Sequence, residues 1–113
     1  MVLCGANSYE EKYYLNSEFD GLPEQIKDEL RILCVLHTAE FRGILILEFD
    51  DDGNLLLKAE AAEDDYSYDE IGSELKIRKI LREKEELFRS LELYYKVFIK
   101  GQGRDELLKE EKK

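Results

Sequence analysis

The sequence predicts an α+β fold: a short helix, a three-stranded antiparallel meander, and a long C-terminal amphipathic helix packed across the sheet. Three observations lead to this prediction. An Asp-Gly turn separates two apolar runs, Pro23 opens a helical pattern, and apolar residues recur at helical spacing from Ile77 to Phe98. The 113 residues have the usual size of one domain, so we expect a single domain over residues 1–100 and a polar tail over residues 101–113.

The first 20 residues leave two local structures open. Ser8 and Glu11 have the spacing of a helix capping box, whereas residues 12–16 are equally typical of a short strand. The following helix is better defined, because Pro23 suits a first helical position and acids fill the first turn. We therefore expect a short helix over residues 24–30.

Residues 31–40 fit either a continuing helix or a buried strand, because residues 32–38 are apolar without a clear break. Their β-branched content favours a strand. We therefore expect a meander over residues 31–62, whose last two strands flank the turn at residues 50–54. The residues expected on the covered face of its sheet are Leu45, Leu47, Phe49, Leu55, Leu57 and Ala59.

The pattern of residues 74–99 is typical of one long amphipathic helix. Such a helix is roughly 39 Å long, whereas a compact chain of this size is about 34 Å across. The apolar stripe covers either the chain's own sheet or a second copy, and a kink would be the other way to cover an overhanging end. Lys84 at an inner position fits both alternatives, because its stem can pack while its ammonium reaches a glutamate or solvent. The candidate interaction residues are Ile77, Ile80, Leu87, Leu91, Tyr94 and Phe98.

Charge is separated along the chain, whose formal net charge is −10. Residues 1–75 hold 19 acids against 5 bases, a net of −14, while residues 76–113 hold 8 acids against 12 bases, a net of +4. This separation favours contact between the basic helix and the acidic part, within one chain or head to tail between copies. The expected partner is a second copy, forming a homodimer, or another protein, and not nucleic acid, which the net charge repels.

The compartment is expected to be the cytoplasm. Two cysteines are too few for a disulfide framework, so we expect reduced thiols. The longest strictly apolar run, residues 44–47, is far too short to cross a membrane, and no basic and apolar leader pattern opens the chain. We therefore expect no membrane partner.

Metal binding has one candidate set, which consists of Cys4, Cys34 and His37. Structural zinc sites usually need four ligands with closely spaced cysteine pairs, so we expect a core cysteine beside an ordinary histidine and no metal site. A Cys34-His37 dyad would place both side chains on one face only if residues 34–37 are helical. The turn at residues 50–54 fails as a calcium loop, because Leu55 and Ala61 occupy the positions that need Gly and Glu.

The chain contains no recognisable catalytic or dinucleotide-binding motif, so we expect no catalytic residue and no cofactor. The alternative to this prediction is an acidic, tyrosine-containing loop at residues 63–70 that binds a small molecule or a divalent metal and carries an enzymatic activity. The same acids are also explained by a solvated loop that leads into the long helix.

Six short segments together carry a resemblance to a family of short uncharacterised acidic proteins from anaerobic Gram-positive bacteria. The segments are residues 1–4, 12–16, 47–50, 52–55, 69–73 and 90–96, and the resemblance covers about residues 1–99. It implies a bacterial cytosolic setting. It implies no activity, cofactor or site residue, because the family has no assigned function.

The function that the sequence favours is therefore a non-enzymatic protein-interaction domain that self-associates. The wide apolar stripe, the separated charge and the missing catalytic motifs support it. A small acidic dimeric chaperone is a weaker alternative that rests on analogy of fold alone.

Overall fold

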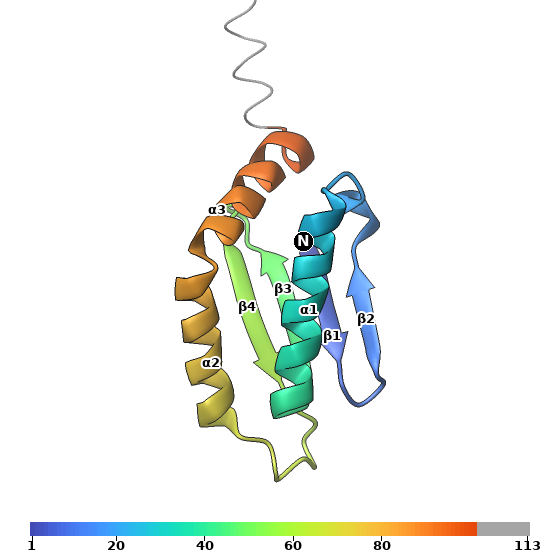
Figure 1. Cartoon of the computed structure of the whole chain (residues 1–113), viewed down its shortest axis with the longest axis vertical. Helices are drawn as coiled ribbons and strands as arrows, with labels where there is room; N and C mark the ends of the chain where they lie inside the picture. Colours follow the sequence, from blue (N-terminus) through green and yellow to red (C-terminus); the bar gives the residue numbers. More distant parts are fainter. Residues whose placement is uncertain (102–113) are drawn as a thin grey trace, which may run out of the picture.

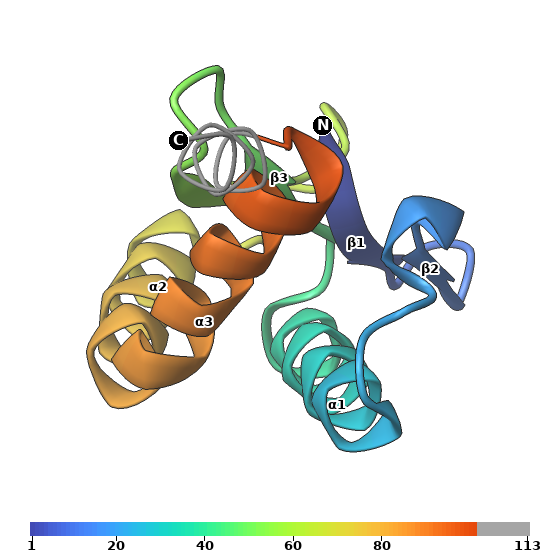
Figure 2. The ribbon, with the colours of Figure 1, turned by 90° about the horizontal axis from the view of Figure 1, so that it is seen from above.

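The computed structural model describes residues 1–101, which form a four-stranded antiparallel sheet with helices on one side (Figures 1 and 2). The strands are β1 (Val2–Asn7), β2 (Lys12–Leu15), β3 (Ile44–Phe49) and β4 (Leu55–Glu60), in the spatial order β2-β1-β3-β4. The mixed helix and sheet class was predicted correctly, but the three-stranded meander was wrong. The predicted tail, apart from Gly101, lies outside the described residues.

The two additional strands form a hairpin at the start of the chain. Cys4 lies opposite Leu15, and Asn7 lies opposite Lys12. The Asn7 side chain accepts hydrogen bonds from the backbone N–H groups of Tyr9 and Glu10, which closes the turn, and Glu11 has a φ of 53°. The strand alternative for residues 12–16 is thus the correct one, and Ser8 and Glu11 belong to a turn and cap no helix.

Residues 31–40 are helical, so their prediction as a strand was wrong. Helix α1 runs without interruption over Glu24–Phe41. Burial alternates in pairs along it: Leu33 and Cys34 are buried, Val35 and Leu36 are exposed, and the next two residues are buried again. This is the period of a helix with one side against the sheet. The outer side of this helix is apolar where a polar stripe is usual, so the sequence did not show the helical period.

The hairpin between β3 and β4 confirms the predicted Asp-Gly turn. Strand residues Leu45, Leu47 and Phe49 are paired with Ala59, Leu57 and Leu55. The carboxylate of Asp50 accepts hydrogen bonds from the backbone N–H groups of Asp52 and Asn54, and Gly53 has a φ of 84°. The side chains predicted on the covered face are buried or partly buried there.

The C-terminal helical region begins earlier than predicted and bends once. Helix α2 spans Glu70–Glu83, helix α3 spans Glu85–Tyr94, and η2 (Tyr95–Ile99) is a π-helical turn. Lys84 leaves the helical conformation between α2 and α3, with φ −109° and ψ 23°. The one long helix predicted over residues 74–99 is therefore divided in two, and the kink that the sequence left open lies at Lys84.

The core lies between the sheet and the helices, which all cover the same face (Figure 2). A short 3-10 helix, η1 (Ser17–Phe19), places Phe19 in an aromatic cluster in which Phe49 and Tyr95 stack with ring centroids 4.2 Å apart. This cluster joins β3, η1 and the end of the C-terminal helix. The opposite face of the sheet is not covered by any described helix.

We predict that Phe19→Ala lowers the free energy of unfolding by about 3–5 kcal/mol, because Phe19 is fully buried and its removal leaves a cavity. Urea denaturation followed by circular dichroism measures the change. The matched control is Phe98→Ala on the exposed side of the same region, which should change stability by less than about 1 kcal/mol. Equal losses in both variants would contradict the described core.

Candidate functional site

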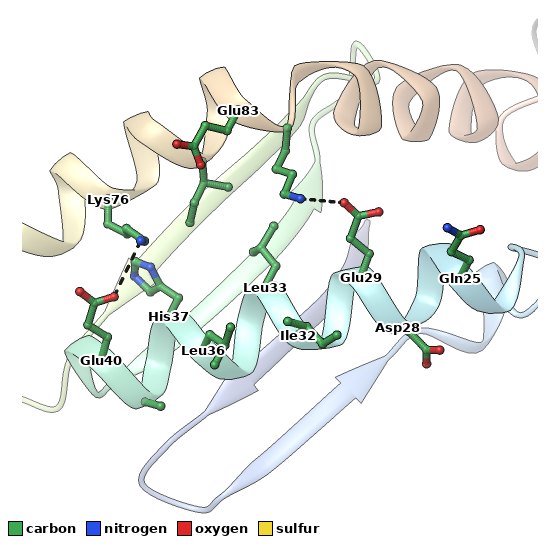
Figure 3. A pocket seen from close by; sticks show the side chains of 13 residues that line it. Gln25, Asp28, Glu29, Ile32, Leu33, Leu36, His37, Glu40, Lys76 and Glu83 are labelled. Carbon is green, nitrogen blue, oxygen red and sulfur yellow. Dashed lines mark hydrogen bonds and ion pairs between the residues drawn. The ribbon is translucent and has the colours of Figure 1, made fainter.

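A groove with a volume of about 970 Å³ lies between α1 and α2 (Figure 3). Two ion pairs cross it. Lys84 Nζ lies 2.9 Å from Glu29 Oε1, and Lys76 Nζ lies 4.0 Å from Glu40 Oε2. Since the residue numbers rise along one helix and fall along the other, these pairs show that α1 and α2 are antiparallel.

Apolar side chains form the middle of the groove. Leu33 and Ile80 are buried at its floor, whereas Ile32 and Leu36 are 54% and 63% exposed on its α1 wall. Val35 and Ala39, also exposed, extend this surface over the outer side of α1. We call Ile32, Val35, Leu36 and Ala39 the outer strip; their spacing of i, i+3, i+4 and i+7 is that of one helix face.

The charged residues of the groove are mostly acidic. Its lining contains four acids and two lysines, a net charge of −2, and they are Asp28, Glu29, Glu40, Glu83, Lys76 and Lys84. Both lysines are already paired with glutamates across the groove. Asp28 forms no ion pair within residues 1–101. The lining therefore combines an apolar middle with a small excess of negative charge.

His37 lies under the groove and links three segments. Its Nε2 atom is 3.1 Å from the Ser73 hydroxyl of α2, and the Tyr68 hydroxyl donates a hydrogen bond of 2.9 Å to the same oxygen. Burial lowers the pKa of His37 below its ordinary value, with Glu40 opposing and Lys76 adding to this effect. The imidazole is therefore neutral at pH 7, and its buried Nδ1 atom has no hydrogen-bond partner among residues 1–101.

This His37-Ser73-Tyr68 chain was not predicted from the sequence. His37 comes more than 30 residues before Tyr68 and Ser73 in the sequence, and no motif connects a histidine of one helix with a serine of another. The only available signal was a lone histidine in an apolar segment. Ser73 is almost completely buried, so the chain is suited to fix α2 against α1 rather than to attack a substrate.

Cys4 and Cys34 meet in the core, but His37 does not join them. Their sulfur atoms are 3.9 Å apart, across the contact between β1 and α1, and both side chains are fully buried. The hydrogen bond with Cys4, together with burial, raises the pKa of Cys34, so this thiol stays protonated. Within the described residues, no group of three acidic, cysteine or histidine side chains has the geometry of a metal site. The ring of His37 faces Ser73, so the Cys34-His37 dyad does not form.

The acidic loop at residues 63–70 is held by protein groups. Asp65 accepts hydrogen bonds from the hydroxyl groups of Tyr9 and Ser67, at 2.7 and 2.8 Å, and lies 3.7 Å from Arg42 Nε. The hydrogen bond from Tyr9 has the largest effect and that from Ser67 the next largest, and both hold the pKa of Asp65 below its ordinary range. Tyr66 points into solvent. Asp65 therefore anchors the loop to the rest of the protein and does not converge with other acids on a ligand.

The six interaction residues predicted on the C-terminal helix have different surroundings. Ile77, Ile80 and Leu91 are buried in the core of the same chain, and Leu87 and Tyr94 are partly buried against it. Phe98 is 60% exposed. Exposed apolar side chains also lie on α1, where a strand had been expected, namely Ile32, Val35 and Leu36.

No helix in the described range is both long and apolar enough to cross a lipid bilayer.

The fold and the groove define a small two-layer protein, with an antiparallel sheet on one side and two antiparallel helices that enclose an apolar groove on the other. The chain belongs to the family of unknown function DUF6145, which it matches over residues 1–103. This agrees with the expected uncharacterised family, while the bacterial source stays a prediction. No curated protein and no solved structure matches the chain.

We predict that acidification through about pH 6.5 destabilises the protein through His37. Its pKa is lower in the folded state, so the unfolded chain binds more protons as the pH falls below the unfolded value of about 6.5. Stability is therefore retained above that pH and lost below it. Urea unfolding at several pH values between 7.5 and 5.5 measures this loss. His37→Gln should flatten the profile over the same interval, and an identical slope in both proteins would contradict the buried neutral imidazole.

We also predict that Cys4 and Cys34 do not react with a thiol reagent in the folded protein and react fully in denaturant, because both thiols are buried. Ellman's reagent reports the rate. Ser90→Cys, which adds a thiol at an exposed position, provides the control and should react at once. Fast labelling of the unmodified protein would show that the contact between β1 and α1 opens.

Proposed function

We propose that this protein is a non-enzymatic protein-interaction domain that uses the groove between α1 and α2 together with the outer strip. One observation supports it above all: α1 is apolar on two opposite sides, and the sheet covers only one of them. Exposed apolar side chains that adjoin on one helix face are typical of a surface that another protein covers. The outer strip is therefore the candidate contact surface.

The polar groups near the groove support binding rather than catalysis. Glu29 and Glu40 are paired with lysines, and the Nε2 atom of His37 is occupied by Ser73. A catalytic base must reach a substrate proton with a free, suitably placed atom. The groups that remain available at the groove are mainly aliphatic side chains, which contribute to binding through burial.

The shape and charge of the groove favour an amphipathic helix with basic flanks. From Gln25 to Glu40, α1 offers about 22 Å of wall, the length of a helix of about 15 residues. The occupant would place apolar residues on the outer strip and basic residues near Asp28, Glu29 and Glu40. This is the helix-in-groove mode of recognition.

A pair of fluorescent helical peptides tests the proposal. Both peptides carry leucines at helical spacing, but one has lysines and the other glutamates on its remaining positions. We predict that the protein binds the lysine peptide and raises its fluorescence anisotropy, whereas the glutamate peptide binds at least roughly tenfold more weakly because the groove is acidic.

Two variants with the same change of charge provide the control. Leu36→Lys places an ammonium in the middle of the outer strip and should abolish binding, while Leu56→Lys on the uncovered face of the sheet should leave binding intact. Equal binding by these two variants would show that net charge attracts the peptide without the groove. Absence of binding by the unmodified protein would refute the proposed chemistry of the partner.

A further inference from the structure

We infer that the surface covering the outer strip is helix α2 of a second copy of this chain, in a symmetric dimer built from the two helical layers. This inference rests on the proposed interaction function and names its partner. It follows from the apolar and charged residues of α2, from the direction of the two helices, and from the position of both on one side of the sheet.

The outer side of α2 has the chemistry that the groove selects. Leu75 is 59% exposed and, as the neighbour of Lys76, which pairs with Glu40, it lies level with the Ala39 end of the outer strip. Ile71, which is 75% exposed, lies one turn beyond that end. Arg78, Lys79 and Arg82 are exposed beside them. Arg78 and Lys79 lie 3.7 and 3.8 Å from Glu74 and Glu83 of the same helix, so Arg82 is the base of this surface that has no ion pair among the described residues.

Charge also distinguishes α2 from the other surfaces. Helix α2 contains four bases against three acids, whereas α1 contains two bases against four acids, within a chain of net charge −10. On α1, the exposed acids Asp28 and Glu40 lie near the two ends of the outer strip. The separation of charge along the sequence thus becomes a separation between two neighbouring helices, which makes contact between copies favourable when α1 meets α2.

The fold allows this contact to form twice in one dimer. Because α1 and α2 lie side by side on the same face of the sheet and run antiparallel, a two-fold axis parallel to both helices places each α1 opposite α2 of the other copy (Figures 1 and 2). The facing helices are then antiparallel as well. The two contacts are equivalent, and the assembly closes at two copies with the sheets on the outside.

The other symmetric arrangement is disfavoured by charge. A two-fold axis perpendicular to the helices would pack α1 against α1 of the other copy. Residues on one flank of a helix then face the same flank of its counterpart, so Glu29 and Glu40, which share the groove side of α1, would approach each other between copies. The first arrangement brings acids to bases instead.

The first experiment measures the mass of the full chain by sedimentation equilibrium from micromolar to millimolar concentrations. We expect a monomer–dimer equilibrium that Leu36→Lys weakens by at least roughly tenfold, because the change buries an unpaired charge at the centre of the contact. Leu56→Lys adds the same charge on the uncovered sheet face and should dimerise as the unmodified chain does. Thermal melts of each variant establish that it is folded.

The second experiment tests the pairing of α1 with α2 by charge exchange. One variant carries Asp28→Lys and Glu40→Lys on α1, and the other carries Arg78→Glu and Arg82→Glu on α2. Each variant alone should dimerise at least roughly tenfold more weakly, because both of its contacts join like charges. An equimolar mixture should recover a heterodimer, since one contact is then fully reversed and the other is unchanged.

The outcomes separate this inference from the proposed function. A chain that stays monomeric at millimolar concentration, yet binds the lysine peptide, overturns the dimer and leaves the interaction function standing. A dimer that Leu36→Lys does not weaken, or an α2 variant that dimerises as the unmodified chain does, overturns the pairing of α1 with α2. Weaker dimerisation of each variant alone supports it, since a two-fold axis perpendicular to the helices pairs α1 with α1 and α2 with α2, where each change only replaces one like-charge contact with another.

Discussion

The contact between the inner side of α1 and the sheet is the interaction on which the rest of the structure depends. Leu30 and Cys34 of α1 are completely buried, as are Cys4 on β1 and Leu45 and Leu47 on β3. Because α1 connects β2 to β3 in the chain, this contact fixes the N-terminal hairpin beside the central hairpin and completes the four-stranded sheet. It also sets the position of the α1 wall, and hence the width of the groove.

The bend at Lys84 adapts the C-terminal region to this arrangement. The lysine leaves the helical conformation and reaches Glu29 on α1, while α3 turns toward the end of the sheet and brings Tyr95 onto Phe49. Aromatic residues thereby cover one end of the core. Helices α1 and α2 remain on either side of the groove. The ion pairs at Glu29 and Glu40 hold the two walls without filling the space between them.

The sequence predicted structural features that depend on neighbouring residues better than those that depend on contacts between distant segments. The hairpin at residues 50–54 followed from local turn chemistry, and the start of α1 followed from Pro23. The strand expected at residues 31–38 failed because Ile32, Val35 and Leu36 hide the helical period behind a second apolar side. The first strand could not be paired in advance, because its neighbours are set by α1 packing. The groove and the contact of His37 with Ser73 depend on helix placement, which no spacing in the sequence encodes.

The two apolar sides of α1 also place different constraints on its evolution. Substitutions at Leu30, Leu33 and Cys34 must fit side chains of the same molecule, so they are limited by folding. Substitutions in the outer strip leave that core untouched, so the packing of the chain's own core does not limit them. A single helix therefore carries two sets of positions, interleaved along 18 residues, that selection can change independently of each other.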